Sequence, residues 1–477
     1  MNHLQDPLAA EINRRAFLGQ SVAGLGAFGL TGLLGRESLA QSLLQAGSPG
    51  EPRARRVIMI FLSGGLSQFE TFDEKPLLAE RRGEQIPESV RAGEVTSAIT
   101  ERQGNLAVVG SAFDFARHGE CGMNISELFP HVAKHADDLT LVRSLQTDFV
   151  LHEAAVTLLF TGSPLVGRPS WGSWVSYALG SANDNLPEFV VMLSGGERLA
   201  PLHPRLWHSG YLPGRYQGVP MRSAGDPVLF VNNPAGVDEG ARKQVIDAVK
   251  QLDAITAEAS GDPRVQARIQ SYEMAARLQT SVPELADLSK EPKDVLERYG
   301  AEPGKKSFAA NCLLARRLAE RDVRFIQVCD GGWDHHGNLP RALPRKCKTI
   351  DQPVGALLTD LKERGLLDDT IVLMLSEFGR APICEGGLSH NRYGRDHNGR
   401  VGSAILAGGG FRKGLTYGVT DDWGWRVAED PVHIHDLQAT VLHQLGQNHE
   451  RLVVRHQGRD FRLTDVGGRV VHELIES

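Results

Sequence analysis

Residues 57–65 read Val57-Ile58-Met59-Ile60-Phe61-Leu62-Ser63-Gly64-Gly65, an unbroken apolar run that stops at a serine and two glycines. Continuous apolarity, without alternating polar residues, is typical of a strand that is covered on both faces. Three further runs have this form, and each is followed closely by acidic residues or glycine: 324–329, 371–375 and 403–407. These four runs predict a sheet that is buried between helices.

Helical stretches lie between these runs, at 307–321 and 354–365. Alternating strands and helices predict an α/β fold, with a large, mostly parallel sheet sandwiched by helices. Ligands bind outside the carboxyl ends of the strands in such sheets, and the polar clusters of this sequence follow those ends. Residues 238–296 are rich in Ala, Gln, Glu and Lys at helical spacing, so they are expected to form a helical insertion.

The N-terminal segment reads as an export signal. Arg14 and Arg15 precede Phe-Leu and a weakly apolar, Gly- and Ala-rich run to Gly35, and Ser38-Leu39-Ala40 offers a cleavage site after Ala40. We therefore expect a twin-arginine signal at 1–40, a linker at 41–56 and one large domain at 57–477.

The alternative to a signal is a transmembrane anchor, but glycines and polar residues make this run a poor membrane span. Twin-arginine signals are receptor-read addresses for a route that moves folded cargo. They predict the twin-arginine translocase as a partner during export and a periplasmic or extracellular location.

Composition excludes several functional classes. The formal net charge is −6 and the pI is about 6.3, with Lys and Arg scattered among acids, so the sequence offers no basic field for nucleic acid. Its five cysteines are widely spaced and include no C-x-x-C pair, which excludes a zinc knuckle and a disulfide framework. We interpret them as small apolar residues, with at most one or two bridges.

The densest polar cluster is 330–337, Asp-Gly-Gly-Trp-Asp-His-His-Gly, directly after a predicted strand. Carboxylate and imidazole together suit a hard-to-borderline divalent cation such as Zn, Mn or Mg. The alternative is a polar loop with a helix-capping Asp. The spacing leaves open whether His335 or His336 points inward.

Three other features could contribute to a site. Asp396-His397 precedes the strand at 403–407, although a surface turn has the same form. Glu377 ends another strand beside Arg380, which could bind an anionic ester oxygen or pair with Glu377. His152 begins a predicted helix, where a capping or core histidine is the alternative.

Several blocks of the sequence together resemble the DUF1501 family of exported bacterial proteins, along nearly the whole chain. They include FLSGGLSQFETFDEKP (61–76), HEAAVTLLFTG (152–162), GGWDHHGN (331–338), LMLSEFGRAP (373–382) and GRDHNG (394–399). That family is similar to the alkaline phosphatase and sulfatase superfamily. The resemblance implies a large α/β sandwich and the hydrolysis or transfer of phosphate or sulfate esters with one or two divalent metals.

The resemblance also implies roles for individual residues. Asp334, His336 and His397 match metal ligands, and Glu377 stands where Asp-His is usual, so all four are candidate ligands. His152 falls at or beside the nucleophile position and Ser63 at the place of the first-strand Asp, so a complete two-metal site with the usual nucleophile is not recognisable. Zn is the expected metal, with Mn, Mg or Ca as alternatives.

These observations predict an exported metal-dependent hydrolase of an anionic phosphate or sulfate ester, such as a sulfated polysaccharide fragment. His152 would act as nucleophile or general base, with Arg380 as a second catalytic residue. The alternative is a non-catalytic binding or assembly protein that retains the fold. A metal site with an open coordination position would favour the enzyme, because structural sites are closed.

Overall fold

A computed structural model of the 477-residue chain describes residues 51–91, 106–183, 185–194, 203–228, 238–260, 278, 281–389 and 392–476. The predicted signal at 1–40 and the linker up to residue 50 lie outside these ranges. Within them, no helix combines the length and the apolarity needed to cross a membrane.

An eight-stranded sheet forms the centre of the molecule, and its strand order is β13-β4-β12-β9-β1-β8-β6-β7. The strands are β1 (Arg56–Ser63), β4 (Leu139–Val142), β6 (Phe189–Ser194), β7 (Val219–Met221), β8 (Phe325–Gly331), β9 (Thr370–Leu375), β12 (Ala404–Ala407) and β13 (Leu415–Tyr417). The predicted strand at 57–62 lies in the middle as β1, parallel to β8 and β9, and Phe61 stands opposite Cys329 and Leu375.

The α/β class is confirmed, but the sheet is mixed rather than mostly parallel. β12 runs antiparallel to β9 on one side and to β4 on the other. The cause is the route of the chain: after β9 it forms a hairpin beyond the carboxyl edge of the sheet and re-enters at that edge. Ala404 therefore pairs with Leu375, and Ala407 with Val372 further back.

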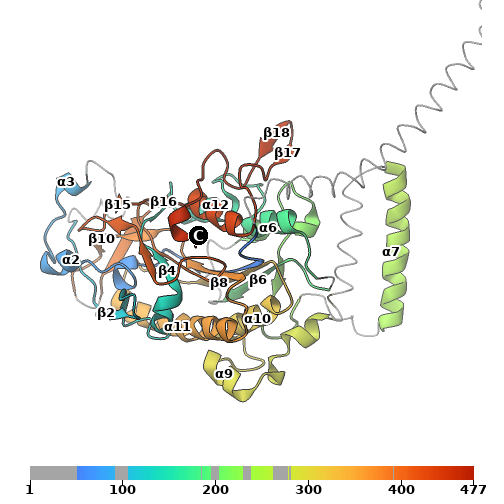
Figure 1. Ribbon diagram of the computed structural model, residues 1–477, viewed down its shortest axis with the longest axis horizontal. Coiled ribbons are helices and arrows are strands. Elements are labelled where there is room, and N and C mark those ends of the chain that lie inside the picture. The colour runs from blue at the N-terminus through green and yellow to red at the C-terminus, as the bar shows by residue number, and fades with distance from the viewer. Residues whose placement is uncertain are drawn as a thin grey trace, which may run out of the picture.

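Alternate residues of β1 belong to two separate cores, as expected for a strand covered on both faces. Ile58 and Ile60 pack in the core that includes α10 and α11, whereas Met59 and Phe61 pack in the core that includes α5, α6 and α12. Figure 1 shows α6 and α12 on one side of the sheet and α10 and α11 on the other. The five helices are α5 (His152–Thr161), α6 (Trp171–Leu179), α10 (Phe308–Ala319), α11 (Leu339–Glu363) and α12 (Ile434–Gln444).

Local sequence signals set the ends of these helices. The Ser307 side chain accepts a hydrogen bond from the Ala310 N–H at 3.0 Å and so caps the start of α10. α5 ends at Gly162, whose φ of +66° is the left-handed conformation that glycine adopts without steric cost. The two helices predicted from the sequence thus correspond to α10 and to the second half of α11.

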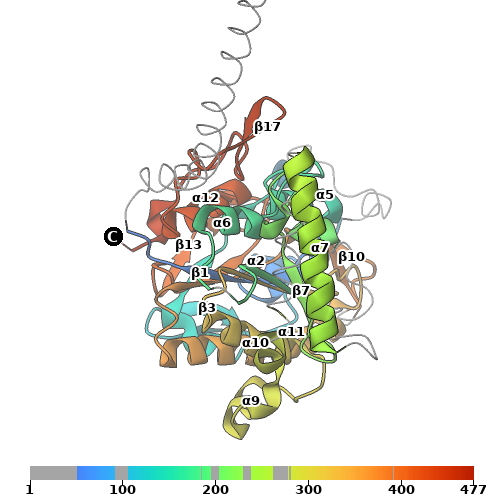
Figure 2. The same ribbon diagram turned by 90° about the vertical axis from the view of Figure 1, so that its right-hand side faces the viewer.

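The segment predicted as a helical insertion contains α7 (Glu239–Ser260) and α9 (Lys293–Tyr299), with residues 261–277 and 279–280 outside the described part. α7 lies at the right of Figure 1, apart from the sheet, and faces the viewer in Figure 2. The other elements are α2 (Pro76–Glu80), α3 (Glu88–Arg91) and five two-stranded ribbons: β2 (Phe115–His118) with β3 (Met123–Ser126), β5 (Leu145–Gln146) with β16 (Val432–His433), β10 (Gly379–Glu385) with β11 (Gly394–Asn398), β14 (Val419–Thr420) with β15 (Val427–Glu429), and β17 (Val454–His456) with β18 (Arg459–Phe461).

All five cysteines are free, and four of them are buried. This agrees with their interpretation as small apolar residues.

Candidate metal centre

The six predicted site residues meet beyond the carboxyl edge of the central strands. Three come from loops that follow β8 and β9, one begins α5, and two lie on the β10–β11 ribbon. They are Asp334 and His336 after β8, Glu377 after β9, His152 at the first position of α5, and Arg380 and His397 on the ribbon. The structure therefore brings together residues from four separate blocks of the sequence.

Asp334 is at the centre of this group. Its Oδ1 lies 2.9 Å from His336 Nε2 and 3.2 Å from His397 Nε2, and these two nitrogens are 3.0 Å apart. Its Oδ2 lies 3.4 Å from His152 Nε2. The Asp334 side chain is 42% exposed, so the centre is open to solvent.

Each of the three histidines is anchored at its other nitrogen, Nδ1, by an oxygen atom. A neutral imidazole that donates from Nδ1 presents a lone pair at Nε2, which is the arrangement found for metal-binding histidines. The three acceptors are Glu377 Oε1 for His152 at 2.6 Å, Glu385 Oε2 for His336, and the Val150 carbonyl oxygen for His397 at 2.7 Å. All three Nε2 atoms are consequently directed toward Asp334.

The charges of this group raise the pKa of two imidazoles. Hydrogen bonds to Asp334 and Glu385 raise the pKa of His336 to about 9. Burial lowers the pKa of His152, but hydrogen bonds to Asp334 and Glu377 outweigh burial and raise it to about 9. Without a cation in the centre, both rings are protonated at neutral pH.

The other two members of the centre have lowered pKa values. Burial lowers the pKa of His397. Burial of Asp334 favours its neutral form, yet its hydrogen bonds to the three histidines keep its pKa well below the usual range. The centre thus consists of one carboxylate that stays ionised, two imidazoles with a raised pKa, and the His397 imidazole with a lowered pKa.

Glu377 lies behind His152 rather than beside Asp334. Its side chain is fully buried, and both carboxylate oxygens accept from the Gly64 N–H, at 3.0 and 3.1 Å. Ser376 Oγ donates to Oε2 at 2.9 Å. In this position Glu377 holds the His152 ring at Nδ1, and its role as a metal ligand stays a prediction.

Arg380 is also buried, and its guanidinium is engaged by the protein. Nε donates to the Gly65 carbonyl at 2.7 Å, and Nη1 donates to the Arg395 carbonyl at 2.9 Å. Nη2 donates to the Gly64 carbonyl and, at 2.7 Å, to Asp334 Oδ1. Arg380 therefore positions Asp334, whereas the sequence suggested a contact with an ester oxygen or with Glu377.

Gly64 allows the loops after β1 and β8 to approach each other. Its φ is +126°, and a Cβ there would lie 2.4 Å from the Asp334 nitrogen. The Phe378 ring closes the apolar side of the centre, with its centroid 5.0 Å from that of His152 and 4.6 Å from that of His397. These contacts hold the imidazoles in a fixed arrangement.

Sequence reasoning missed the anchor of His336. Glu385 ends the buried strand β10 directly after an apolar run, and a carboxylate in that place was the available signal. Of His335 and His336, the structure turns His336 toward Asp334. Burial lowers the pKa of His335 to about 4.

The donor atoms fit a divalent cation. Ligands at about 2.0–2.2 Å from a tetrahedral ion are roughly 3.3–3.6 Å apart, a few tenths of an ångström more than the 2.9–3.2 Å between Asp334 Oδ1, His336 Nε2 and His397 Nε2. His152 Nε2 is buried and lies 3.4 Å from Asp334 Oδ2, next to these donors. His152, Asp334 and His397 offer atoms within 4.8 Å of one another, as do His336, Glu385 and Asp396.

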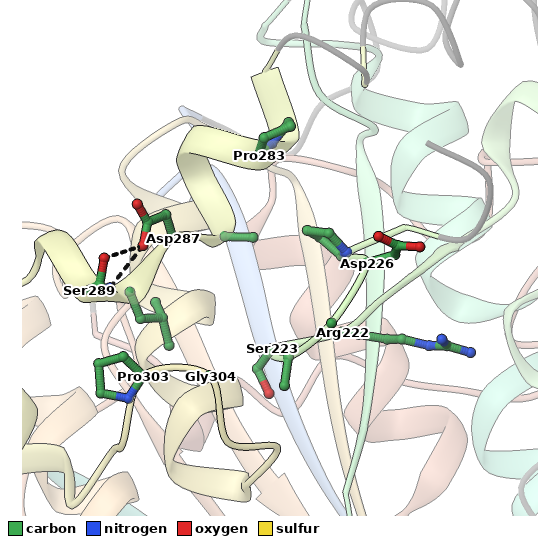
Figure 3. Close-up of a pocket in the computed structure, with 13 residues that line it drawn as sticks. Arg222, Ser223, Asp226, Pro283, Asp287, Ser289, Pro303 and Gly304 are labelled. Carbon is green, nitrogen blue, oxygen red and sulfur yellow. Dashed lines mark hydrogen bonds between the residues drawn. The ribbon is translucent and has the colours of Figure 1, made fainter. Parts of the chain in front are cut away.

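A cavity of about 530 Å³ lies away from this centre, between residues 222–227 and 283–304 (Figure 3). No predicted site residue lines it. Its Asp287 carboxylate accepts from the Ser289 N–H at 3.1 Å and so caps a short helical turn.

Comparisons with known proteins place residues 54–475 within the sequence profile described as "Protein of unknown function (DUF1501)". None of the curated proteins matches the chain. Among solved structures, an alkaline phosphatase superfamily protein from Vibrio parahaemolyticus has 9% identity and a TM-score of 0.35, over 86% of this chain and 74% of that one. The sulfatase PsFucS1 from Pseudoalteromonas sp. has 11% identity and a TM-score of 0.34, over 87% and 72%. The lipoteichoic acid synthase LtaP from Listeria monocytogenes has 8% identity and a TM-score of 0.33, over 86% and 78%.

Proposed function

The chain belongs to the DUF1501 family, and we propose that this member is an exported metal-dependent hydrolase of phosphate or sulfate esters. The observation that carries the proposal is the convergence of three Nε2 atoms on Asp334, with every Nδ1 held by an oxygen. An anchored histidine with a free Nε2 beside a carboxylate is the donor set of a zinc site.

Asp334, His336 and His397 would hold the cation, with Zn²⁺ as the expected metal and Mn²⁺, Mg²⁺ or Ca²⁺ as alternatives. Three protein ligands at a solvent-open centre leave a coordination position for substrate, which is typical of catalytic rather than structural sites. A bound divalent cation supplies Lewis-acid activation of an ester oxygen and of water. His336 also belongs to a second group with Glu385 and Asp396, whose ligand atoms lie within 4.8 Å of one another. In this group Glu385 holds the ring of His336 at Nδ1, away from the cation.

His152 is the residue for proton transfer or nucleophilic attack. Its Nε2 lies next to Asp334 Oδ2, and Glu377 fixes its ring as a carboxylate orients the histidine of a catalytic triad. His152 is also the first residue of α5, where the helix dipole stabilises negative charge. An anionic ester placed there would meet both the imidazole and the start of the helix.

One observation favours the second candidate, a non-catalytic binding or assembly protein. The Arg380 guanidinium contacts four backbone carbonyls and Asp334, and its side chain is 1% exposed. It is thus committed to the protein rather than to an ester oxygen. Binding of a metal and of an anion without turnover would be the behaviour of this candidate.

The test combines metal analysis with turnover. The purified protein would be assayed with Zn²⁺, Mn²⁺, Mg²⁺ or Ca²⁺ on p-nitrophenyl phosphate and p-nitrophenyl sulfate, beside the Asp334→Asn variant. We expect about one tightly held metal per chain, lost in Asp334→Asn together with the activity. Metal binding without cleavage of either ester would give the binding protein preference, and no metal binding would exclude both forms of the proposal.

A further inference from the structure

A polar cavity shares a wall with the metal centre. It has a volume of about 530 Å³, within the roughly 300–1,000 Å³ typical of ligand pockets. Its lining consists of Gln146, Thr147, Asp148, Val150, Gly399, Arg400 and His433. Val150, whose carbonyl anchors His397, and Gly399, two residues beyond His397, belong to the cavity and adjoin the centre.

The wall between the two is rigidly bonded. The Thr147 N–H donates to the Gly399 carbonyl at 2.7 Å, and Gln146 Nε2 donates to the Arg400 carbonyl at 3.1 Å. A Cβ on Gly399 would lie 2.8 Å from the Phe149 carbonyl oxygen, so the two segments are packed as closely as backbone allows. A group bound in the cavity would therefore sit at a fixed place relative to His397.

One polar atom in the cavity wall, Thr147 Oγ1, lacks a hydrogen-bond partner among the described residues, on a side chain that is 8% exposed. His433 Nε2 lies 3.3 Å from Asp148 Oδ2, with which it forms an ion pair when the ring is charged. His433 Nδ1 accepts from the His435 N–H, so in the neutral ring Nε2 carries the proton and is a donor. Buried polar atoms without partners are costly, and a ligand that bonds to them removes that cost.

The chemistry of the lining selects the ligand. His433, Arg400 and Gln146 provide donors, Asp148 provides acceptors, and the Thr147 hydroxyl provides both. A second anion would face the Asp148 carboxylate, whereas hydroxyl groups can both donate and accept. We propose that this cavity is a subsite for a neutral, hydroxyl-bearing ring of the substrate, such as a sugar residue, which places the ester that it carries at the metal centre. The assignment of the ester rests on the proposed function, but binding of the ring does not.

The test uses the full zinc-supplemented protein and three neutral probes, methyl β-D-galactoside, methyl α-D-mannoside and methyl α-D-glucoside, followed by saturation-transfer NMR and calorimetry. We expect at least one glycoside to bind and its affinity to fall about tenfold or more in Asp148→Ala and in Thr147→Val. Asp368→Ala, which changes a carboxylate that is 85% exposed elsewhere, is the matched control and should bind as the wild type does.

Thr147→Val separates a binding role from a structural one. It removes a buried hydroxyl that has no partner, so Tm should stay unchanged or rise while the glycoside affinity falls. A lower Tm in this variant would give the hydroxyl a structural role and count against the subsite. The subsite proposal would be overturned by any of three results. These are absence of binding for all three glycosides, equal binding by wild type and variants, and competition by inorganic sulfate for the same residues.

Turnover of p-nitrophenyl sulfate and phosphate, measured on the same samples, keeps the two proposals distinct. Glycoside binding without turnover would remove the hydrolase and leave the subsite. Turnover without glycoside binding would support the hydrolase and remove the subsite.

Discussion

Glu377 Oε1 lies 2.6 Å from Nδ1 of His152, although 225 positions separate the two residues in the chain. Burial alone would raise the pKa of Glu377, but its hydrogen bond to His152 and the neighbouring charge lower it, so it stays a carboxylate. This pair fixes both the tautomer and the direction of the imidazole. Substituting Glu377 and His152 one at a time therefore measures what each contributes to turnover.

Glu377→Gln should lower kcat/KM for an aryl ester by about 10–100-fold, because the amide offers an N–H where His152 needs an acceptor. The metal content should stay at the wild-type level, since Glu377 does not contact the three proposed ligands. Kinetics with metal analysis by mass spectrometry would check this, with Glu363→Gln on the surface as control. Loss of metal from Glu377→Gln would make the glutamate a ligand, as the sequence predicts.

His152→Ala should reduce turnover by about a hundredfold or more, the scale of losing a general base or nucleophile. The bound metal should be retained, because Asp334, His336 and His397 stay in place. His118→Ala, on the β2–β3 ribbon, serves as the control. If the metal leaves with the imidazole of His152, that residue is a fourth ligand and water becomes the nucleophile.

Zinc binding should release protons. The pKa of His336, a proposed ligand, is raised to about 9 in the metal-free protein, so its ring carries a proton at a pH of about 7.5 and loses it when Nε2 binds the cation. Calorimetry in buffers of different ionisation enthalpy should count about one proton per zinc and show an affinity that increases with pH. A proton count of zero would mean that zinc binds elsewhere.

The same shifts govern the stability of the metal-free protein. A histidine whose folded pKa exceeds its unfolded value of 6.5 contributes stability that is complete below pH 6.5 and is lost as the pH rises through about 9. Urea unfolding of the metal-free protein should show this loss between those limits. Adding zinc should restore the stability that is lost at high pH.

Glu70→Gln should destabilise the protein by about 3–5 kcal/mol, because it leaves a buried cation without its partner. Glu70 and Arg395 are both fully buried, and Arg395 donates to Glu70 Oε1 from Nε at 2.9 Å and from Nη2 at 2.7 Å. Urea unfolding, with the exposed Glu80→Gln as control, measures the change. A difference below about 1 kcal/mol would show that the pair contributes little to folding.

Replacing Arg14 and Arg15 together by lysine should abolish export, because the twin-arginine receptor reads the arginine pair. A reporter fused after residue 50 would measure it, with a single replacement of Arg36 as control. Unimpaired export would indicate an ordinary secretory signal or an anchor.

The sequence predicted the α/β class and the buried strand at 57–62, because a continuous apolar run has few alternatives to a doubly covered strand. It also predicted that acids and histidines after strands would lie at one edge. The spacing alone left open whether His335 or His336 faces the centre, and Glu377 was expected among the ligands. A side chain at a strand end can turn either way, and the turn of Glu377 depends on the Gly64 N–H, 313 residues away.

The antiparallel direction of β12 could not be predicted from the sequence either, because it follows from the route of the β10–β11 ribbon rather than from local propensity. The same holds for Arg380. An arginine beside a glutamate suggests a pair or an anion site, but here backbone carbonyls after β1 accept its protons.

The central place of β1 has a consequence for synthesis. Its partners β8 and β9 end at residues 331 and 375, so the apolar strand leaves the ribosome long before either neighbour exists. At about 5–20 residues per second the wait for β9 is roughly 15–60 s, during which an aggregation-prone segment is unpaired. The native sheet is complete only after its last strand, β13, has been made, when most of the chain has left the ribosome.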